Sequence, residues 1–338
     1  VVFGHSYALT QSGGLIWLSL VNTKLAVQGF FIISGFLILR SYENCHNISI
    51  YFIKRVRRLY PAYVSCLIFA LLLVILFSSI KINFNFLVDA FKYLFWNLLF
   101  LNHIYPTLPG IYANHPVSAM NGALWTLKVE ICFYASVPFL VFFANRFSRS
   151  LMLLLLYFLS CTYFYIFSHN YFHISSHVSE MMSHQIPAQI RFFLVGMAGY
   201  WFFDFFSQYK NIFLFCSLLV CAVSTLLGIG SLMLEPVCLG VIIIYFSFFS
   251  GFYLNAGRYG DLSYGSYIYH FPIIQTFITL GFYNAHPIYA FMFSLFMILL
   301  LSLFSWKYIE KPFLYKNSHY KLSEISNLSI RKMIKVVL

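Results

Sequence analysis

Charged residues are scarce in this 338-residue sequence, and the acidic ones are the scarcest. Only 9% of the residues are charged, with nine Asp and Glu in total, whereas 61% are hydrophobic. A soluble globular domain has about 25% charged and roughly 45–50% apolar residues. So few charges could not cover the surface of a soluble protein of this size, which excludes that class. The composition predicts an all-α, polytopic integral membrane protein.

The sequence also lacks the usual signatures of a metal site or a disulfide framework. Its seven cysteines show no CxxC or Cys/His ligand spacing and are odd in number, so we interpret them as small buried hydrophobic residues. His169, His173 and His177 are spaced to share one helical face. No carboxylate or thiol follows them at ligand spacing, so we expect a solvated loop, no metal site and no permanently bound cofactor.

Long apolar runs predict the helices, since a spanning helix needs roughly 17–25 mostly apolar residues. Together with a first segment that contains His5, we expect about ten spans. The candidates lie near residues 25–42, 60–79, 124–144, 151–168, 186–204, 211–229, 233–253, 263–282 and 287–307. Residues 93–104 are apolar but too few to span, so we expect an interfacial or re-entrant piece there.

The Lys and Arg residues indicate an orientation. If the helices alternate and the C-terminus is cytoplasmic, most of the 21 Lys and Arg face the cytoplasm, as the positive-inside rule favours. We therefore expect a membrane domain over residues 1–314 and a basic cytoplasmic tail over residues 315–338 that lies along the anionic leaflet. The net charge of +12 then reflects membrane topology, and we expect no nucleic-acid partner.

Ionisable side chains are costly in lipid, so each one within a span is a candidate functional residue. The chief candidates are His5, Glu130, Arg191 and His270. The densest basic stretch is KRVRRLYPAY, at residues 54–63. Its Arg55 and Arg58 would share one face of a helix, where two guanidinium groups can hold one anion. The alternative is that this basic cluster only flanks a membrane span and binds no ligand.

Six stretches occur in order along the chain: LAVQGFFIISGFLILRSY, KRVRRLYPAY, ALWTLKVEICFYASVPF, RFFLVGMAGYWF, LSYGSYIYHFPI and YIEKPF. Together they resemble the membrane acyltransferase-3 family, whose members are integral-membrane O-acyltransferases of bacterial surface polysaccharides. The resemblance runs from His5 to about Phe313. It implies transfer of an acyl group, most often acetyl, from cytoplasmic acyl-CoA to a hydroxyl of an extracytoplasmic or lipid-linked glycan, such as O-antigen, capsule or exopolysaccharide, at the bacterial inner membrane.

The resemblance also implies the roles of four site residues. His5 stands where the family has its catalytic histidine, which would act as a general base or as a nucleophile. Glu130 matches the motif's glutamate, which would orient the imidazole or pair with an arginine. The motif's paired arginines fall on Arg55 and Arg58, which would hold the phosphates of CoA.

Four further residues match the family's patterns as substrate contacts or structural supports. His270 would contact substrate or form a structural hydrogen bond. Ser34, with Gly35, would permit close helix approach. Trp125 would line the acceptor path or anchor at the interface, and Arg191 would form a structural ion pair.

The chain departs from the family in two places. Lys128 and Ile131 stand where small polar and acidic residues are usual. Family members also carry a basic residue roughly ten positions, about three helical turns, before the catalytic histidine. Only four residues precede His5 here, so we expect a truncated first helix.

Other functions fit parts of the pattern. A transporter or flippase of a lipid-linked sugar would also need charges within the membrane, although it would not need the six ordered motifs. The same pattern of charges would fit transfer of a succinyl group instead of an acetyl group. It would also fit peptidoglycan as the acceptor. A separate extracytoplasmic partner protein is also conceivable.

Overall fold

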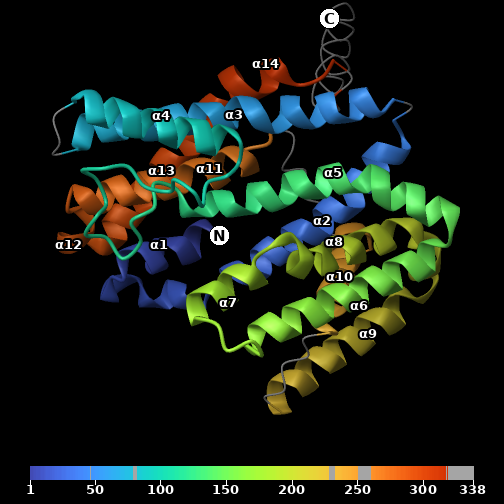
Figure 1. The fold of residues 1–338 in the computed structure, drawn as a ribbon. Helices are drawn as coiled ribbons and strands as arrows, with labels where there is room; N and C mark the ends of the chain where they lie inside the picture. Colours follow the sequence, from blue (N-terminus) through green and yellow to red (C-terminus); the bar gives the residue numbers. More distant parts are fainter. Residues whose placement is uncertain (46, 79–81, 228–232, 250–259, 317, 319–338) are drawn as a thin grey trace, which may run out of the picture. The chain divides into compact units, whose positions relative to one another are not determined.

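The structure is a computed structural model that describes residues 1–45, 47–78, 82–227, 233–249, 260–316 and 318 (Figure 1). Every regular element within these residues is helical, which confirms the all-α prediction. Most of the predicted tail, 319–338, lies outside the described residues.

Each predicted span overlaps a helix of the structure. These helices are α2 (Thr23–Glu43), α3 (Ile48–Phe77), α5 (Trp125–Arg146), α6 (Arg149–Ser168), α8 (Ile186–Trp201), α9 (Phe203–Leu227), α10 (Glu235–Phe248), α11 (Ser263–Thr279) and α13 (Pro287–Phe304). The predicted first segment contains α1 (Val2–Thr10), followed by the 3-10 helix η1 (Gly13–Leu20).

Six segments of the described chain are long and apolar enough to cross a membrane. The remaining candidates are shorter, since α8, α10 and α11 have 16, 14 and 17 residues, near the lower limit for a span. The chain is therefore a multi-pass membrane protein, and the count of ten spans stays a prediction.

Three predicted boundaries were wrong. α9 begins at Phe203, eight residues before the predicted start near residue 211. α3 begins at Ile48, twelve residues before the predicted start, and therefore includes the basic stretch and Pro61. Hydropathy misses this part because charged residues interrupt the apolar run, yet Arg and Lys are good helix formers. Residues 93–98 are the end of α4 (Phe84–Leu98), whose first turn is capped by the Asn83 side chain.

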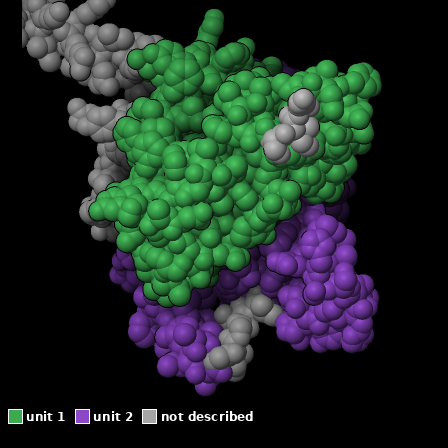
Figure 2. Space-filling view, turned by 90° about the vertical axis from the view of Figure 1, so that its left-hand side faces the viewer, with its two compact units in different colours: residues 1–23, 52–125, 254–338 green, residues 24–51, 126–253 purple. Residues whose placement is uncertain are grey.

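The described chain forms two compact units (Figure 2). Unit 1 comprises residues 1–23, 52–125 and 254–338, and unit 2 comprises residues 24–51 and 126–253. In unit 1, α11 packs against α1 and α13. In unit 2, α8 packs against α6 and α10, and α10 packs against α9.

Two glycines bring α2 and α8 into backbone contact within unit 2. A Cβ atom added at Gly196 would lie 2.0 Å from the carbonyl oxygen of Ile32, and one added at Gly35 would lie 2.1 Å from that of Phe193. Neither position has room for a larger residue. The expected role of the SGF motif in close helix approach is thus confirmed at Gly35.

Candidate active site

His5 and His270 meet in unit 1. His5 lies on α1 and His270 on α11, and the two helices pack against each other. The Nδ1 atom of His5 is 2.8 Å from Nε2 of His270, and the rings stack with centroids 5.1 Å apart. His270 is fully buried, whereas His5 is half-buried. The structure therefore brings together two histidines that the sequence marked separately.

The hydrogen bonds fix which nitrogen carries each proton. Nδ1 of His270 lies 2.6 Å from the carbonyl oxygen of Tyr267, which can only accept. In the neutral imidazole one nitrogen is a donor and the other an acceptor. We therefore assign the His270 proton to Nδ1, so that Nε2 of His270 accepts from Nδ1–H of His5. This tautomer leaves the lone pair of His5 on Nε2.

The segment before α5 lies beside this pair. The Tyr267 hydroxyl donates to the carbonyl oxygen of Ala123 at 2.8 Å, and a Cβ added at Gly122 would lie 2.9 Å from the Phe271 ring. The same Phe271 ring meets His5 edge to face, with centroids 5.9 Å apart. Trp125, at the start of α5, is half-buried. The segment's contacts with α11 include those of Gly122 and Ala123 and a hydrogen bond from the Asn121 side chain to the Ile268 carbonyl oxygen at 2.7 Å.

The loop between α4 and α5 packs against the next turns of α11. The Tyr112 hydroxyl is 2.8 Å from that of Thr276, and burial raises the pKa of Tyr112 to about 12. Nδ1 of His115 is 2.6 Å from Oε1 of Gln275, while Nε2 of Gln275 donates to the carbonyl oxygen of Val117 at 2.5 Å. These bonds hold the helix that carries His270 against the loop.

Arg58, at the basic end of α3, is bound by two carboxylates within unit 1. Its guanidinium forms ion pairs with Asp261 and, at 3.2 Å, with Glu310. Glu310 is fully buried and also accepts from the Ser305 hydroxyl at 2.9 Å. The Arg58 guanidinium lies 5.7 Å from the Trp306 ring. The positive charge of Arg58 is thus compensated inside the protein.

The other basic residues of this stretch are arranged differently. Arg55 is half-buried and lies one turn before Arg58 on α3. Lys54 and Arg57 face the Tyr315 ring, with charged groups 5.6 Å and 5.8 Å from its centroid. Together, Lys54, Arg55 and Arg57 add three further positive charges to this end of α3. An anion can therefore be attracted to this end of α3.

Glu130 belongs to unit 2, on α5. It is 4% exposed and accepts a hydrogen bond from the Tyr134 hydroxyl one turn later. The Tyr51 hydroxyl in turn donates to the Tyr134 carbonyl oxygen at 2.9 Å. Lys128 points elsewhere and donates to Gln185 at 3.0 Å. Tyr134 is thus a partner that the sequence did not indicate, and the two roles considered for Glu130 stay predictions.

Ser34 and Arg191 are also buried in unit 2. The Arg191 guanidinium lies 3.6 Å from the ring centroid of Phe164 and 4.8 Å from that of Phe192, which is cation–π geometry. The ion pair expected for Arg191 stays a prediction.

A small polar cavity of about 410 Å³ lies near one end of unit 2. Its lining includes Lys24, Glu180 and His184 together with the Phe164 ring. Lys24 and Glu180 have opposite charges, and four serines also belong to the lining, Ser168, Ser176, Ser179 and Ser183. Its mixture of hydroxyl, charged and aromatic groups suits a polar ligand.

Sequence reasoning missed several polar residues. Asp261 and Glu310 were not among the candidate residues, although both bind Arg58. Gln28 was not singled out, yet it is 1% exposed and its amide has no hydrogen-bond partner among the described residues. An amide inside the apolar run AVQGFF was the available signal for Gln28.

Comparison with known families matches residues 1–307 to the model of an acyltransferase domain. An O-acetyl transferase of Shigella phage Sf6 is 27% identical over 343 residues, which cover 94% of this chain and 93% of that protein. Nodulation protein 10 of Rhizobium leguminosarum bv. viciae is 29% identical over 167 residues, 44% of this chain and 43% of that protein. No solved structure matches the chain.

Proposed function

The chain belongs to the acyltransferase family whose model covers residues 1–307, and it is an acyltransferase; we propose that it acetylates a hydroxyl of a surface or lipid-linked glycan. The donor is acetyl-CoA, a substrate that is consumed rather than a resident cofactor. The name of the phage relative, an O-acetyl transferase, favours acetyl over succinyl. Membership of an acyltransferase family also favours this function over that of a transporter or flippase.

The observation that carries the proposal is the hydrogen-bonded pair His5–His270. Nε2 of His5 accepts the proton of the glycan hydroxyl, and the oxygen forms a bond to the acetyl carbonyl carbon of the thioester. The carbon–sulfur bond then breaks, and His5 returns the proton to the departing CoA thiolate. This is general base and then general acid catalysis by one imidazole.

His270 is a positioning residue in this mechanism. Its Nε2 accepts from Nδ1–H of His5, which fixes the His5 tautomer and stabilises the imidazolium that forms during the transfer, as a carboxylate does in a catalytic triad. The Tyr267 carbonyl oxygen fixes the tautomer of His270 in the same way. A nucleophilic role for His5 would use the same lone pair on Nε2 and would form an acetyl-imidazole.

We assign the CoA phosphates to the basic end of α3, with Arg55 as the direct contact. Arg58 was predicted to share this contact, but Asp261 and Glu310 already bind its guanidinium. Its part in donor binding is therefore to hold the end of α3 in place. Lys54 and Arg57 add positive potential.

The cellular setting is also part of the proposal. The distribution of Lys and Arg supports a cytoplasmic C-terminus in a bacterial inner membrane, so that acetyl-CoA reaches the basic end of α3. The polar cavity beside Lys24 lies at the helix ends that this orientation directs outward, where it can receive part of the glycan. A separate extracytoplasmic protein can deliver that acceptor.

Expression in a bacterium whose glycan lacks O-acetyl groups tests the proposal. We expect alkali-labile acetate on the surface polysaccharide, and its loss in His5→Ala at equal protein level. The control is His286→Ala, since His286 is an exposed histidine of the same unit. Undiminished acetylation in His5→Ala would contradict the proposed mechanism.

A further inference from the structure

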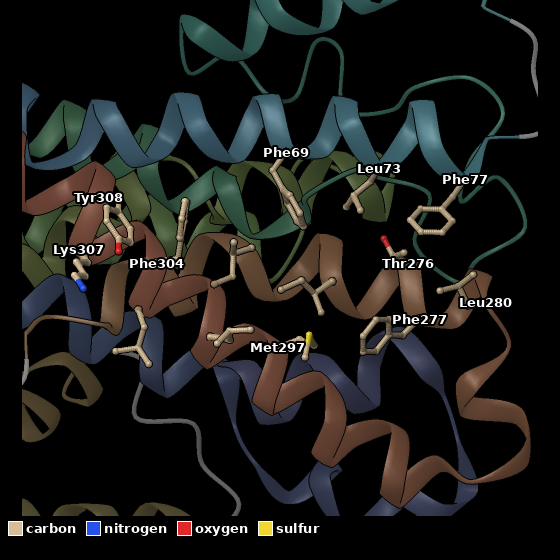
Figure 3. A pocket seen from close by; sticks show the side chains of 14 residues that line it. Phe69, Leu73, Phe77, Thr276, Phe277, Leu280, Met297, Phe304, Lys307 and Tyr308 are labelled. Atoms are coloured by element: carbon tan, nitrogen blue, oxygen red, sulfur yellow. The ribbon is translucent and has the colours of Figure 1, made fainter.

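A long apolar groove runs between α3, α11 and α13 in unit 1 (Figure 3). Its volume is about 790 Å³. Each helix contributes residues three or four positions apart, which is the spacing of a single helix face. The stripe on α3, for example, consists of Phe69, Leu73 and Phe77. Three apolar helix faces therefore enclose one elongated space.

The charged residue of the groove lies at one end. Figure 3 shows Lys307 and Tyr308 at that end and Phe77 and Leu280 at the other. Both Lys307 and Tyr308 are exposed, and Nζ of Lys307 lies 5.2 Å from the Tyr308 ring centroid. Thr276 lies toward the other end, near Phe77 (Figure 3), and its hydroxyl already donates to the Pro272 carbonyl oxygen at 2.8 Å. The groove thus has an apolar body and a cationic mouth.

The half of the groove next to Lys307 is as long as one leaflet of a bilayer. From Met297, in the middle of the groove, its lining follows α13 and the π-helical turn Ser305–Glu310 to Tyr308, roughly 16 Å at the rise of an α-helix. The hydrocarbon core is about 30 Å thick, so one leaflet contributes about 15 Å. A lipid chain anchored at Lys307 would therefore reach from the headgroup region to the middle of the membrane.

We propose that this groove is a binding site for an anionic phospholipid, with an acyl chain along α3, α11 and α13 and the phosphate at Lys307 and Tyr308. The ammonium pairs with the phosphate, and the tyrosine hydroxyl donates a hydrogen bond to it. A zwitterionic phospholipid supplies the same chain but brings a compensating positive charge to Lys307. A polyprenyl phosphate has the right charge, but its chain is much longer than one leaflet.

Photo-crosslinking of the purified full chain tests this proposal. The probe is phosphatidylglycerol with a diazirine on one acyl chain, and the same probe built on phosphatidylcholine is the comparison. We expect crosslinks on the peptides that contain Phe69–Phe77 and Met297–Phe304, at higher yield with phosphatidylglycerol. Lys307→Gln should lower the phosphatidylglycerol yield about five-fold, the size of one basic residue's interaction with anionic lipid, and leave the phosphatidylcholine yield unchanged.

Two matched control variants distinguish the effect of the charge of Lys307 from the effect of the open volume of the groove. Lys316→Gln removes an exposed positive charge that does not line the groove and should change neither yield. Met297→Trp fills the middle of the groove and should lower both yields, whereas Leu299→Trp, on an exposed face of the same helix, should not. Equal yields for the two lipids in the unmodified protein, or no effect of Lys307→Gln, would overturn the anionic site. Displacement by polyprenyl phosphate at far lower concentrations than phosphatidylglycerol would overturn the choice of occupant.

Discussion

Two imidazoles that lie 265 positions apart in the sequence share one hydrogen bond, from Nδ1 of His5 to Nε2 of His270 at 2.8 Å. A third group, the Tyr267 carbonyl oxygen, determines the direction in which this bond is donated. At the residue scale, the protein thus fixes the tautomer of a histidine through a second one that is fully buried. Removing the second histidine would leave the first with its tautomer unspecified.

His270→Phe should therefore lower kcat for acetyl transfer by on the order of 100-fold, near the low end of what a positioned base contributes. The KM for acetyl-CoA should change little, since the basic end of α3 is untouched. Initial rates at several acetyl-CoA concentrations separate the two constants. A raised KM with an unchanged kcat would show instead that His270 contacts a substrate.

Arg58 provides a second prediction at this scale. Arg58→Ala removes the cation from the Oε2 atom of the buried Glu310. Breaking a buried ion pair in this way lowers the free energy of unfolding by about 3 kcal/mol. The thermal unfolding midpoint in detergent should fall clearly, and adding Glu310→Gln should restore much of the loss. Arg57→Ala removes an exposed charge from the same helix and should leave the midpoint unchanged. A double variant no more stable than Arg58→Ala alone would contradict the ion-pair account.

At the scale of helices, the packing of α2 on α8 depends on two glycines rather than on interlocking side chains. A Cβ atom at Gly196 would lie 2.0 Å from the Ile32 carbonyl oxygen, so the two backbones would have to separate. In a bilayer, where no hydrophobic force draws helices together, close backbone contact is a main source of association.

Gly196→Ala should therefore destabilise unit 2 by about 1–3 kcal/mol, the usual cost of inserting a methyl group into a packed core. The measurements are the unfolding midpoint and the yield of monodisperse protein in detergent. Gly13→Ala is the control, because a Cβ at Gly13 meets nothing within 4 Å. Equal midpoints for the two variants would show that α2 and α8 tolerate separation.

Helices could be predicted from the sequence better than the side-chain partners of the buried polar residues. Apolar runs identified every described helix of 16 residues or more, because length and hydropathy decide insertion into a membrane. They placed the start of α3 twelve residues late, because hydropathy does not register a helix that continues through charged residues. The carboxylates of Arg58 lie 203 and 252 positions away, and such pairs depend on how helices pack, which no local pattern contains.

The candidate site, too, could be predicted only in part from the sequence. His5 and His270 could be chosen from the sequence, because an ionisable side chain in lipid needs a function or a partner. Arg55 could be chosen because it shares a helix face with Arg58 in the densest basic stretch. The hydrogen bond between the two histidines could not, nor could the Tyr134 partner of Glu130. The types of residue in the sequence indicate which side chains belong to a site. The tautomer of His5 and the ion pairs of Arg58 depend on the fold.

At the scale of the whole molecule, the orientation in the membrane decides which substrate meets which surface. In a variant without its native cysteines, Cys introduced at Asn44, between α2 and α3, should react with a membrane-impermeant maleimide only in permeabilised cells. Cys at His173, between α6 and α7, should react in intact cells. Both residues are exposed, so access depends on the side alone. The reverse pattern would contradict the orientation inferred from Lys and Arg.

The central claim, that this chain moves an acetyl group to a glycan hydroxyl by means of His5, is tested most directly by label transfer in membrane vesicles. Vesicles with the unmodified chain or with His5→Ala, at equal protein amounts, receive acetyl-CoA labelled in the acetyl group. The account predicts labelled acetate in ester linkage on the polysaccharide, at least about 100-fold less of it with His5→Ala, and a normal amount with His286→Ala. No transfer by the unmodified chain, or equal transfer by His5→Ala, would contradict the claim.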